Sequence, residues 1–482
     1  MPFSKLNYVN VGPHGTFRRS GALHTTPEDI DALFRALADS DARKLSLHFH
    51  GGLVKEGHGE AIARAMQPVY EAGGAHAVTF IWETGLIETL TRNLRRIDET
   101  RLFQKLVRYV FRQLTKRLGA DLSERGPGEP MTMAEIEAEL SRIEKFEGFE
   151  ATARSGAETL DEAELEFIEA EMETEFLLEL QDDPELAEGD FAELAGDAPL
   201  EPTLREAMTD VDGRGVSLFQ VAKYLARVTY RVLKRYIRKR DHGLYPTVIE
   251  EILREFYLAD FGAWTWGRMK DIAAEMWLPN GPVIDENAHP GAYFLDKLAA
   301  HMASRPGFTL DLIGHSAGSI AICEMLRAAE VAGRRPPVRN IVFLAPACLT
   351  SLMHREIVAH PERFERFRMF TMSDAYEQKD QLVRGLYTRS LLYFISGVLE
   401  DSPDVPIAGM ERFWSEPALF DDPALTETVA WLGAAGEDRA VLSVTADGAT
   451  GGLTSASQKH GDFDNDPATL ASLTHLVSQA VT

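Results

Sequence analysis

The chain has 482 residues, of which 45% are hydrophobic and 26% charged, the proportions of an ordinary globular protein. No window reaches 18 apolar residues without a charge, and the opening residues lack the basic start and apolar run of a signal peptide, so we expect a cytoplasmic protein without membrane-spanning helices. The two cysteines, Cys323 and Cys348, each lie in an apolar run, which predicts buried thiols and argues against a disulfide framework.

The elements predicted for the first 85 residues alternate between strand and helix. Residues 3–21 carry the Gly and Pro turn signals of a hairpin, which predicts antiparallel edge strands. Apolar runs predict strands over residues 44–50 and 76–82, and helical spacing of apolar residues predicts a helix over residues 59–74.

A strongly acidic segment interrupts this alternation. Residues 121–200 contain 26 Asp and Glu but only 4 Lys and Arg, so this segment carries −22 of the net charge of −25. Its apolar residues lie among many like charges, and we therefore expect residues 121–205 to be solvated, mobile and partly helical. We assign residues 86–289 to a large, mainly helical cap insertion that contains this segment.

Two basic amphipathic helices are predicted beside the acidic segment, over residues 92–119 and 217–243. They are interpreted as packed cap helices, with an anionic membrane surface or ligand as the alternative partner. No aromatic and basic binding motif accompanies them, so we expect no nucleic-acid partner. The tethered acidic segment would have a high effective concentration near both helices, which suggests self-shielding, autoinhibition or a site for a protein partner.

After the insertion the alternation resumes. Strands are predicted over residues 309–315, 340–347, 366–372 and 439–446, and helices over residues 292–304, 319–333 and 466–481. The strands are nearly continuous in apolar residues, as parallel strands buried on both faces are. We therefore predict an α/β fold whose core, residues 1–85 and 290–482, is a doubly wound, mostly parallel sheet.

The stretch "IGHSAGS" places a serine between the strand predicted over residues 309–315 and the helix predicted over residues 319–333. Gly314, His315, Ser316, Ala317 and Gly318 match G-x-S-x-G, in which the small residues allow a strained turn that lifts the serine hydroxyl clear of the sheet. The helix that begins there aims its free amide groups at the same point. The alternative is an ordinary serine that caps the helix.

A serine nucleophile needs a base and an orienting carboxylate, in the order serine, acid, histidine for this type of turn. Asp374 follows a strand at its carboxyl end, where catalytic groups gather in open α/β sheets, and Glu377 and Asp380 are its rivals. His460 follows the last strand through a loop of small residues, in the place expected for the base.

The segment "HFHGGL" after the strand over residues 44–50 supplies candidates for an oxyanion hole. Gly51 and Gly52 let peptide N–H groups approach a tetrahedral oxyanion, together with the N–H of Ala317. His48 and His50 have no partner ligands at zinc spacing, so we expect neither a metal nor another cofactor.

The motifs "HFHGGL", "IGHSAGS", "MSDAYE" and "SQKHGDFDND", in this order, resemble the α/β-hydrolase superfamily, most closely its lipase and esterase branches. The resemblance covers residues 40–85 and 290–482. It implies a covalent acyl-enzyme, with Ser316 as nucleophile, His460 as base and then acid, and Asp374 as the orienting carboxylate.

Two features depart from that family. Leu53 stands where one lipase branch has a third glycine, and the insertion is larger and earlier than the cap of many members, so the substrate class does not follow from the resemblance.

The insertion gives the only hint of substrate. Its last part concentrates large apolar side chains, which line either an acyl pocket or the core of the cap: Tyr257, Phe261, Trp264, Trp266, Met269 and Trp277. We expect an acyl ester substrate, with a lipid ester at a membrane surface as one form and amides as an alternative. A catalytically silent or autoinhibited effector that binds partners through its acidic insert is the competing hypothesis.

Overall fold

The computed structural model describes most of the chain outside the acidic segment. The described residues are 3–51, 56–82, 86–117, 135, 136, 138, 162–182, 217–257 and 261–479. The expectation of a mobile segment over residues 121–205 therefore lies largely outside the described residues, apart from one helix over Glu162–Gln181.

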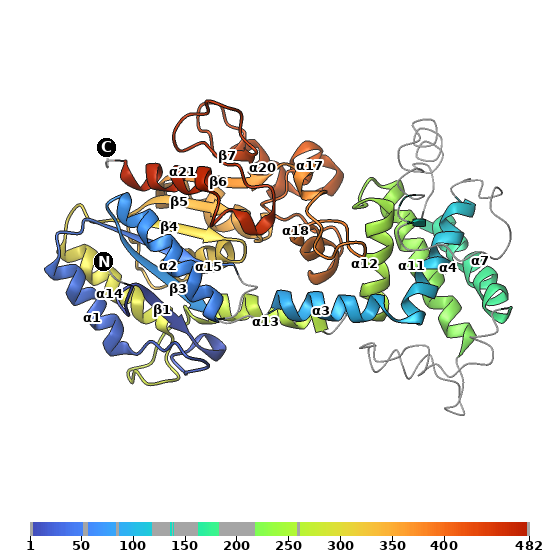
Figure 1. Ribbon diagram of the computed structural model, residues 1–482, viewed down its shortest axis with the longest axis horizontal. Helices are drawn as coiled ribbons and strands as arrows, with labels where there is room; N and C mark the ends of the chain where they lie inside the picture. Colours follow the sequence, from blue (N-terminus) through green and yellow to red (C-terminus); the bar gives the residue numbers. More distant parts are fainter. Residues whose placement is uncertain are drawn as a thin grey trace. The chain divides into compact units, whose positions relative to one another are not determined.

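Seven strands form one sheet in which every neighbouring pair is parallel (Figure 1). Their order across the sheet is β1-β3-β2-β4-β5-β6-β7. The strands are β1 (Tyr8–Val11), β2 (Lys44–Phe49), β3 (His76–Trp82), β4 (Thr309–His315), β5 (Val338–Leu344), β6 (Phe364–Met372) and β7 (Ala440–Ser443). The predicted α/β class and parallel sheet are confirmed, because the long apolar runs form strands buried on both faces.

The predicted hairpin at the start of the chain is wrong. Residues 8–11 form β1, which pairs parallel to β3 with Tyr8 opposite Thr79. After a short turn at 13–15 the chain enters α1 (Pro27–Asp39), whose start is fixed by a capping box between Thr26 and Asp29. A helix therefore separates β1 from the next strand, and such a crossover connects parallel strands rather than antiparallel ones.

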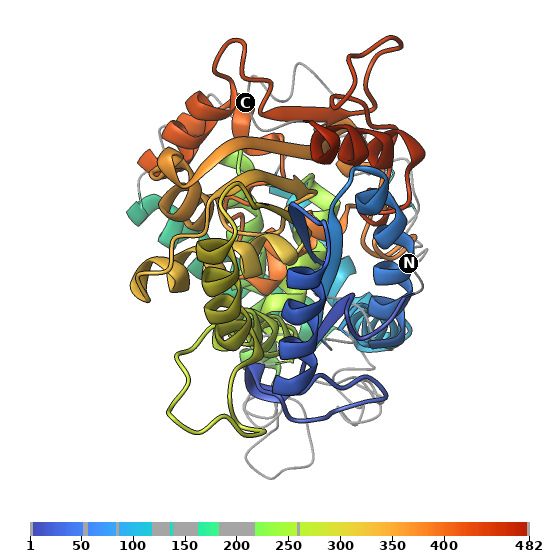
Figure 2. The same cartoon turned by 90° about the vertical axis from the view of Figure 1, so that its left-hand side faces the viewer.

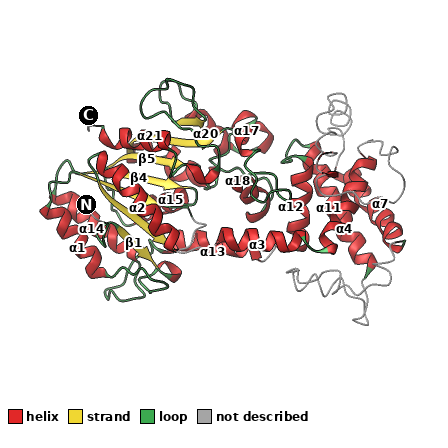
Figure 3. Ribbon diagram, viewed as in Figure 1, coloured by secondary structure: helices red, strands yellow, loops and turns green. Residues whose placement is uncertain are grey.

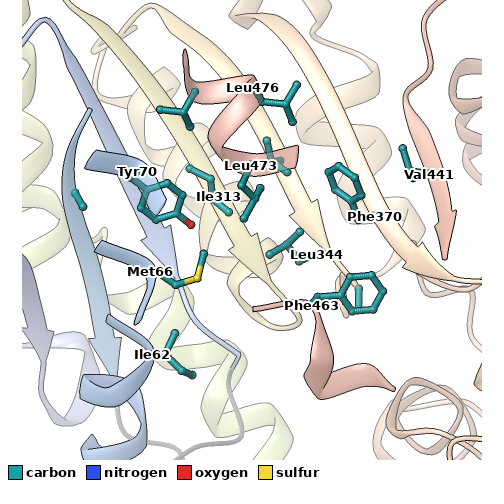
Figure 4. Close-up of a cluster of buried hydrophobic side chains, with 14 of the residues drawn as sticks. Ile62, Met66, Tyr70, Ile313, Leu344, Phe370, Val441, Phe463, Leu473 and Leu476 are labelled. Carbon is teal, nitrogen blue, oxygen red and sulfur yellow. The ribbon is translucent and has the colours of Figure 1, made fainter. Parts of the chain in front are cut away.

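Helices cover both faces of the sheet (Figures 2 and 3). On one face lie α2 (Glu56–Ala72) and α21 (Pro467–Ser478), whose side chains meet those of β4 to β7 in a buried cluster (Figure 4). This cluster includes Met66, Tyr70, Ile313, Phe370 and Leu473. On the opposite face lie α14 (Pro290–Ser304) and α15 (Gly318–Val331). The hydrophobic free energy of this two-sided burial holds the sheet rigid beneath the candidate site.

The chain divides into two compact units. The sheet unit consists of Met1–Ile87, Thr265–Asp380 and Pro406–Thr482, and the helical unit of Glu88–Trp264 and Gln381–Val405. Within the described residues of 86–275, the helices with given bounds are α3 (Leu86–Asp98), α4 (Arg101–Arg117), α7 (Glu162–Gln181), α11 (Leu218–Ile237), α12 (Leu244–Phe256) and α13 (Phe261–Glu275). Shorter helices after β5 are α16 (Thr350–Met353), α17 (Asp374–Glu377), α18 (Leu391–Phe394), α19 (Arg412–Ser415) and α20 (Pro423–Leu432).

The basic helix predicted over residues 92–119 is divided, since α3 ends at Asp98 and α4 begins at Arg101, and the one predicted over residues 217–243 forms as α11. The apolar stripes of α4 and α11 are buried. The described helix of the acidic segment, α7, packs on α11 and pairs its carboxylates with the cations of α4. Arg112 lies 3.1 Å from Glu179, and Glu175 lies 3.0 Å from Lys116 and 3.3 Å from Arg117. Carboxylates of α7 thus pair with three cations of α4.

A buried ionic cluster holds residues 381–405 to the rest of the helical unit. Arg235 on α11 donates to Glu250 at 2.7 Å and to Glu251 at 2.9 Å, both on α12. The two ring nitrogens of His242 lie 2.8 Å from Glu250 and 3.0 Å from Asp404. Because an unpaired charge in such a place is costly, these contacts fix Asp404 against the helices.

None of the described helices combines the length and the apolar character that crossing a bilayer requires.

Candidate active site

The turn between β4 and α15 holds Ser316 in a strained backbone conformation. Its φ is 51°, in the left-handed region that residues other than glycine rarely adopt. The Ser316 N–H donates to the carbonyl of Leu344 at 2.8 Å, and the Ser316 carbonyl accepts from the N–H of Ala347 at 3.1 Å. The hydroxyl of Ser319 also donates to that carbonyl at 2.6 Å. The turn is therefore fixed to β5 and the segment that follows it.

The two glycines of the motif are required by close backbone contacts. A Cβ atom on Gly314 would lie 2.7 Å from the carbonyl carbon of Gly318, and one on Gly318 would overlap the carbonyl of Phe49. The first residue before α15 is Ala317, and no side chain caps this helix end. Ser316 is thus not the ordinary capping serine that was the alternative.

His460 reaches Ser316 from the other end of the chain. It lies in the short 3₁₀ turn His460–Asp462, and its Nε2 is 2.9 Å from the Ser316 Oγ. Both residues are buried, with 2% of Ser316 and 7% of His460 exposed. The structure thus brings together the serine and the histidine that the sequence singled out, in hydrogen-bond contact.

Asp374 does not complete this pair. Its carboxylate accepts from the side-chain amide of Gln378 at 2.7 Å, whereas no described residue bonds to Nδ1 of His460. Asp380, one of the two rivals, accepts instead from the backbone N–H of His460 at 2.9 Å. The other rival, Glu377, is fully buried on α17. Of the three carboxylates, Asp380 is the one bonded to His460.

The electrostatics of the pair follow from burial. Burial, with a smaller contribution from the nearby His315, lowers the pKa of His460 to about 3. Burial also raises the pKa of the Asp380 carboxyl above its ordinary value. An imidazole with so low a pKa is a weak base until a carboxylate faces its Nδ1, since the negative charge then stabilises the imidazolium.

The candidate oxyanion residues lie beside the strained turn. Gly51 is buried, and a Cβ atom at this position would be 3.4 Å from the Cβ of Ser316. Ala317 is fully buried at the start of α15, where the first amide groups of the helix have no partner within the helix. Gly52 lies outside the described residues. Two of the three predicted positions therefore lie next to the Ser316 turn.

His48 and His50 are buried at the end of β2, where each forms hydrogen bonds with neighbouring residues. His48 Nδ1 lies 2.8 Å from the hydroxyl of Tyr70. His50 donates from Nδ1 to the carbonyl of Gly51 at 2.7 Å and accepts at Nε2 from the N–H of Trp82 at 3.2 Å. Burial lowers the pKa of His48 to about 3 and that of His50 to about 4, so both are neutral at physiological pH. His50 thereby fixes the position of Gly51.

Asp464 belongs to the site but was not among the candidates read from the sequence. Its Oδ2 lies 3.5 Å from Nδ1 of His315, which is the residue before Ser316. The only sequence signal was its place in the acidic run directly after His460. A carboxylate four residues after His460 has no spacing that distinguishes it from its neighbours Asp462 and Asp466.

The large apolar side chains described within residues 257–277 are buried. Tyr257, Trp266, Met269 and Trp277 are each at most 4% exposed. Trp277 packs on Phe80, with ring centroids 5.4 Å apart. Phe261 and Trp264 have side chains outside the described set.

No cluster of three or more His, Cys, Asp or Glu able to hold a metal ion occurs among the described residues.

Comparison with known proteins gave no match to a family model, to a curated protein or to a solved structure.

Proposed function

We propose that the protein is a serine hydrolase that cleaves carboxylic esters through an acyl-enzyme. The observation that carries the proposal is the strained Ser316, at φ 51°, with its Oγ 2.9 Å from Nε2 of His460. Strain at a strand-to-helix turn is costly and persists where it positions a nucleophile. The neighbouring β2 and β5 flank β4 in the sheet, which supports an α/β-hydrolase type of fold with the helical unit as its insertion.

In the proposed reaction, Ser316 Oγ attacks the ester carbonyl carbon while its proton passes to Nε2 of His460. The oxyanion is stabilised by the N–H of Ala317 and by backbone N–H groups at Gly51 and Gly52. The bond to the alcohol oxygen then breaks, and His460 returns the proton to that oxygen. Water, deprotonated by His460, attacks the acyl-enzyme and releases the carboxylic acid and free Ser316.

For the orienting carboxylate, the contacts favour Asp380 over Asp374. The Asp380 carboxylate already accepts from the backbone N–H of His460, so it lies beside the residue whose Nδ1 the reaction requires a carboxylate to face. Asp374, held by Gln378, has no described contact with the histidine. Asp380 would then raise the basicity of His460, as the reaction requires.

The test is covalent labelling with a fluorophosphonate probe, followed by a panel of p-nitrophenyl esters from acetate to palmitate and an anilide. We expect labelling of the full chain and of Ser351→Ala, an exposed serine on α16, and none of Ser316→Ala. The ester panel then defines the acyl length, including lipid-like chains, and the anilide tests amide cleavage. Absence of labelling in a folded full chain would favour the catalytically silent effector.

A second role is favoured by the ion pairs between α7 and α4. We propose that α7 shields a basic face that otherwise binds an anionic membrane surface, since the same cations would attract anionic lipids. Exposed ion pairs contribute little each, about 0–1 kcal/mol, so their removal leaves the cations unpaired at a small cost in stability. Met172, Phe176 and Leu180 of α7 are buried and hold the helix in place independently of these charges.

Vesicle sedimentation tests this shielding. Glu171 lies 3.5 Å from Arg117, in addition to the ion pairs of Glu175 and Glu179. Glu171→Gln, Glu175→Gln and Glu179→Gln together should increase binding to phosphatidylglycerol vesicles but not to phosphatidylcholine vesicles. The matched control removes three charges from exposed glutamates of the sheet unit: Glu28, Glu286 and Glu416. Equal binding by both triple variants would remove the shielding role. A partner protein that binds the acidic segment would compete with α4 for the same carboxylates.

A further inference from the structure

His315 joins the strained turn to the loop that carries the histidine of the site. Its Nε2 lies 3.0 Å from the carbonyl oxygen of His460. A carbonyl only accepts hydrogen bonds, so Nε2 of His315 carries a hydrogen and donates it. The two imidazole rings stack with centroids 5.5 Å apart. His315 is therefore bonded to the loop of His460 while its own backbone leads directly into Ser316.

The other ring nitrogen of His315 faces a negative charge. Nδ1 makes no hydrogen bond among the described residues, but it lies 3.5 Å from Oδ2 of Asp464, within the distance of an ion pair. The side chains of His315 and Asp464 are only 7% and 11% exposed. A carboxylate also only accepts, so this nitrogen is favoured with a hydrogen as well. Both nitrogens carry hydrogen only in the imidazolium form, which makes His315 and Asp464 a buried ion pair.

We propose that the His315–Asp464 pair is a positioning device that holds His460 over Ser316, and that it works only while His315 is protonated. The inference rests on the hydrolase function proposed above and adds to it a pH-dependent control of the base. His315 and Asp464 do not touch the reacting atoms. They act through the carbonyl of His460 and through the loop between His460 and Asp464, whose ends they fix against the turn.

The charges of His315 and Asp464 depend on burial and on the attraction between the two side chains. Burial alone would lower the pKa of His315, but the Asp464 carboxylate outweighs it and the pKa lies above its ordinary value. Burial would raise the pKa of Asp464, but His315 holds it below its usual range. The other groups are His48 and His50 at the end of β2, His460, and Tyr70 on α2, whose pKa burial raises. The first three have lowered pKa values, so all four are neutral when His315 changes its charge.

The His315–Asp464 pair should lose its effect at high pH. Since the pKa of His315 is raised in the folded chain, the contribution of the pair is complete below the ordinary histidine value of about 6.5 and is lost as the pH rises through the raised value. Above that value the lone pair of Nδ1 would face the Asp464 carboxylate and weaken the contact. Ester hydrolysis should therefore show a basic limb, on which kcat falls while KM changes little.

The experiment measures kcat and KM against pH for the full chain and for Asp464→Asn, His315→Gln and the control Asp447→Asn, an exposed loop aspartate. Asp464→Asn removes the charge that raises the pKa of His315, so its basic limb should move to lower pH. His315→Gln keeps an amide donor for the His460 carbonyl but cannot titrate, so its basic limb should disappear. At the optimum pH both should lose about 10- to 100-fold in kcat, because a small displacement of the base has effects of that size.

The outcomes separate the two proposals. Failure of the full chain to react with the fluorophosphonate probe at any pH overturns the hydrolase function. Reaction with the probe, together with pH profiles of Asp464→Asn and His315→Gln parallel to that of Asp447→Asn, overturns the positioning role alone. Thermal melting of each variant identifies any that fails to fold, and in that case His315→Asn provides the second non-titrating substitution.

Discussion

Gly318 lies against the carbonyl of Phe49, so that the start of α15 and the end of β2 meet at a point with no space for a side chain. This contact places the strained turn beside the Gly51 backbone. It makes the glycine a structural requirement of the site rather than a feature of the motif alone.

We therefore expect Gly318→Ala to destabilise the sheet unit by about 1–3 kcal/mol or more, because the added methyl group must displace backbone. Urea denaturation followed by fluorescence measures this change. Gly57→Ala is the matched control, since Gly57 lies in the first turn of α2 with nothing within 4 Å of its missing Cβ. Equal stability of the two variants would contradict the close contact.

The choice of carboxylate is tested by Asp380→Asn and Asp374→Asn. Loss of the carboxylate that orients the base should lower kcat by about 10²- to 10⁴-fold, by analogy with the loss of the buried aspartate in serine proteases. We expect this loss for Asp380→Asn and a change below about 3-fold for Asp374→Asn. Ester hydrolysis at saturating substrate is the measurement. The reverse ranking would restore Asp374 as the orienting acid.

A buried ion pair ties β4 to β5 and to the last helix. Arg339 donates to Asp311 at 2.9 Å and also to the carbonyls of Val477 and Gln479. Arg339→Met leaves the Asp311 carboxylate buried without its partner, so we expect a loss of about 3–5 kcal/mol in the free energy of unfolding. Guanidinium denaturation measures it, with the exposed Arg335→Met as control. A loss below about 1 kcal/mol would mean that Asn340, which also donates to Asp311, suffices.

The helical unit should be sensitive to acid through Glu250. Burial alone would raise the pKa of this carboxyl, but His242 and Arg235 lower it to about 2. The carboxyl therefore contributes stability that is complete above the ordinary glutamate value of about 4.3 and is lost as the pH falls toward 2. Glu250→Gln should be less stable at pH 7 and should lose less of its remaining stability on acidification. Circular dichroism melting curves between pH 7 and pH 2 measure this, and parallel curves for both proteins would contradict it.

Much of the fold was predictable because long apolar runs leave little choice. Apolar runs such as residues 309–315 are stable only inside a sheet that is covered on both faces. The pairing of Ser316 with His460 was predictable from the motif around the serine and from the place of the histidine after the last strand. The direction of β1 was not predictable from its turn residues. It depends on the helix that follows, which carries the chain across the sheet before the next strand begins.

The carboxylate that contacts His460 was harder to predict from the sequence, for a different reason. Asp374, Glu377 and Asp380 lie within seven residues, and which of them reaches His460 depends on how the short helix α17 directs each side chain. Asp464 had no signal beyond its acidic neighbourhood. The large apolar residues near 266–277 had two interpretations in sequence, and the structure shows that they are buried.

The chain passes between the two units four times, and one of these passages follows Asp380 directly. The residue bonded to the His460 backbone is thus the last of its segment before the chain continues into residues 381–405, which the ionic cluster around Glu250 and Asp404 secures. Because Asp380 of the sheet unit continues directly into residues 381–405, unfolding of the helical unit would release the segment attached to Asp380. Excision of residues 88–264 alone would therefore leave residues 381–405 attached to Asp380 without the helices that anchor them.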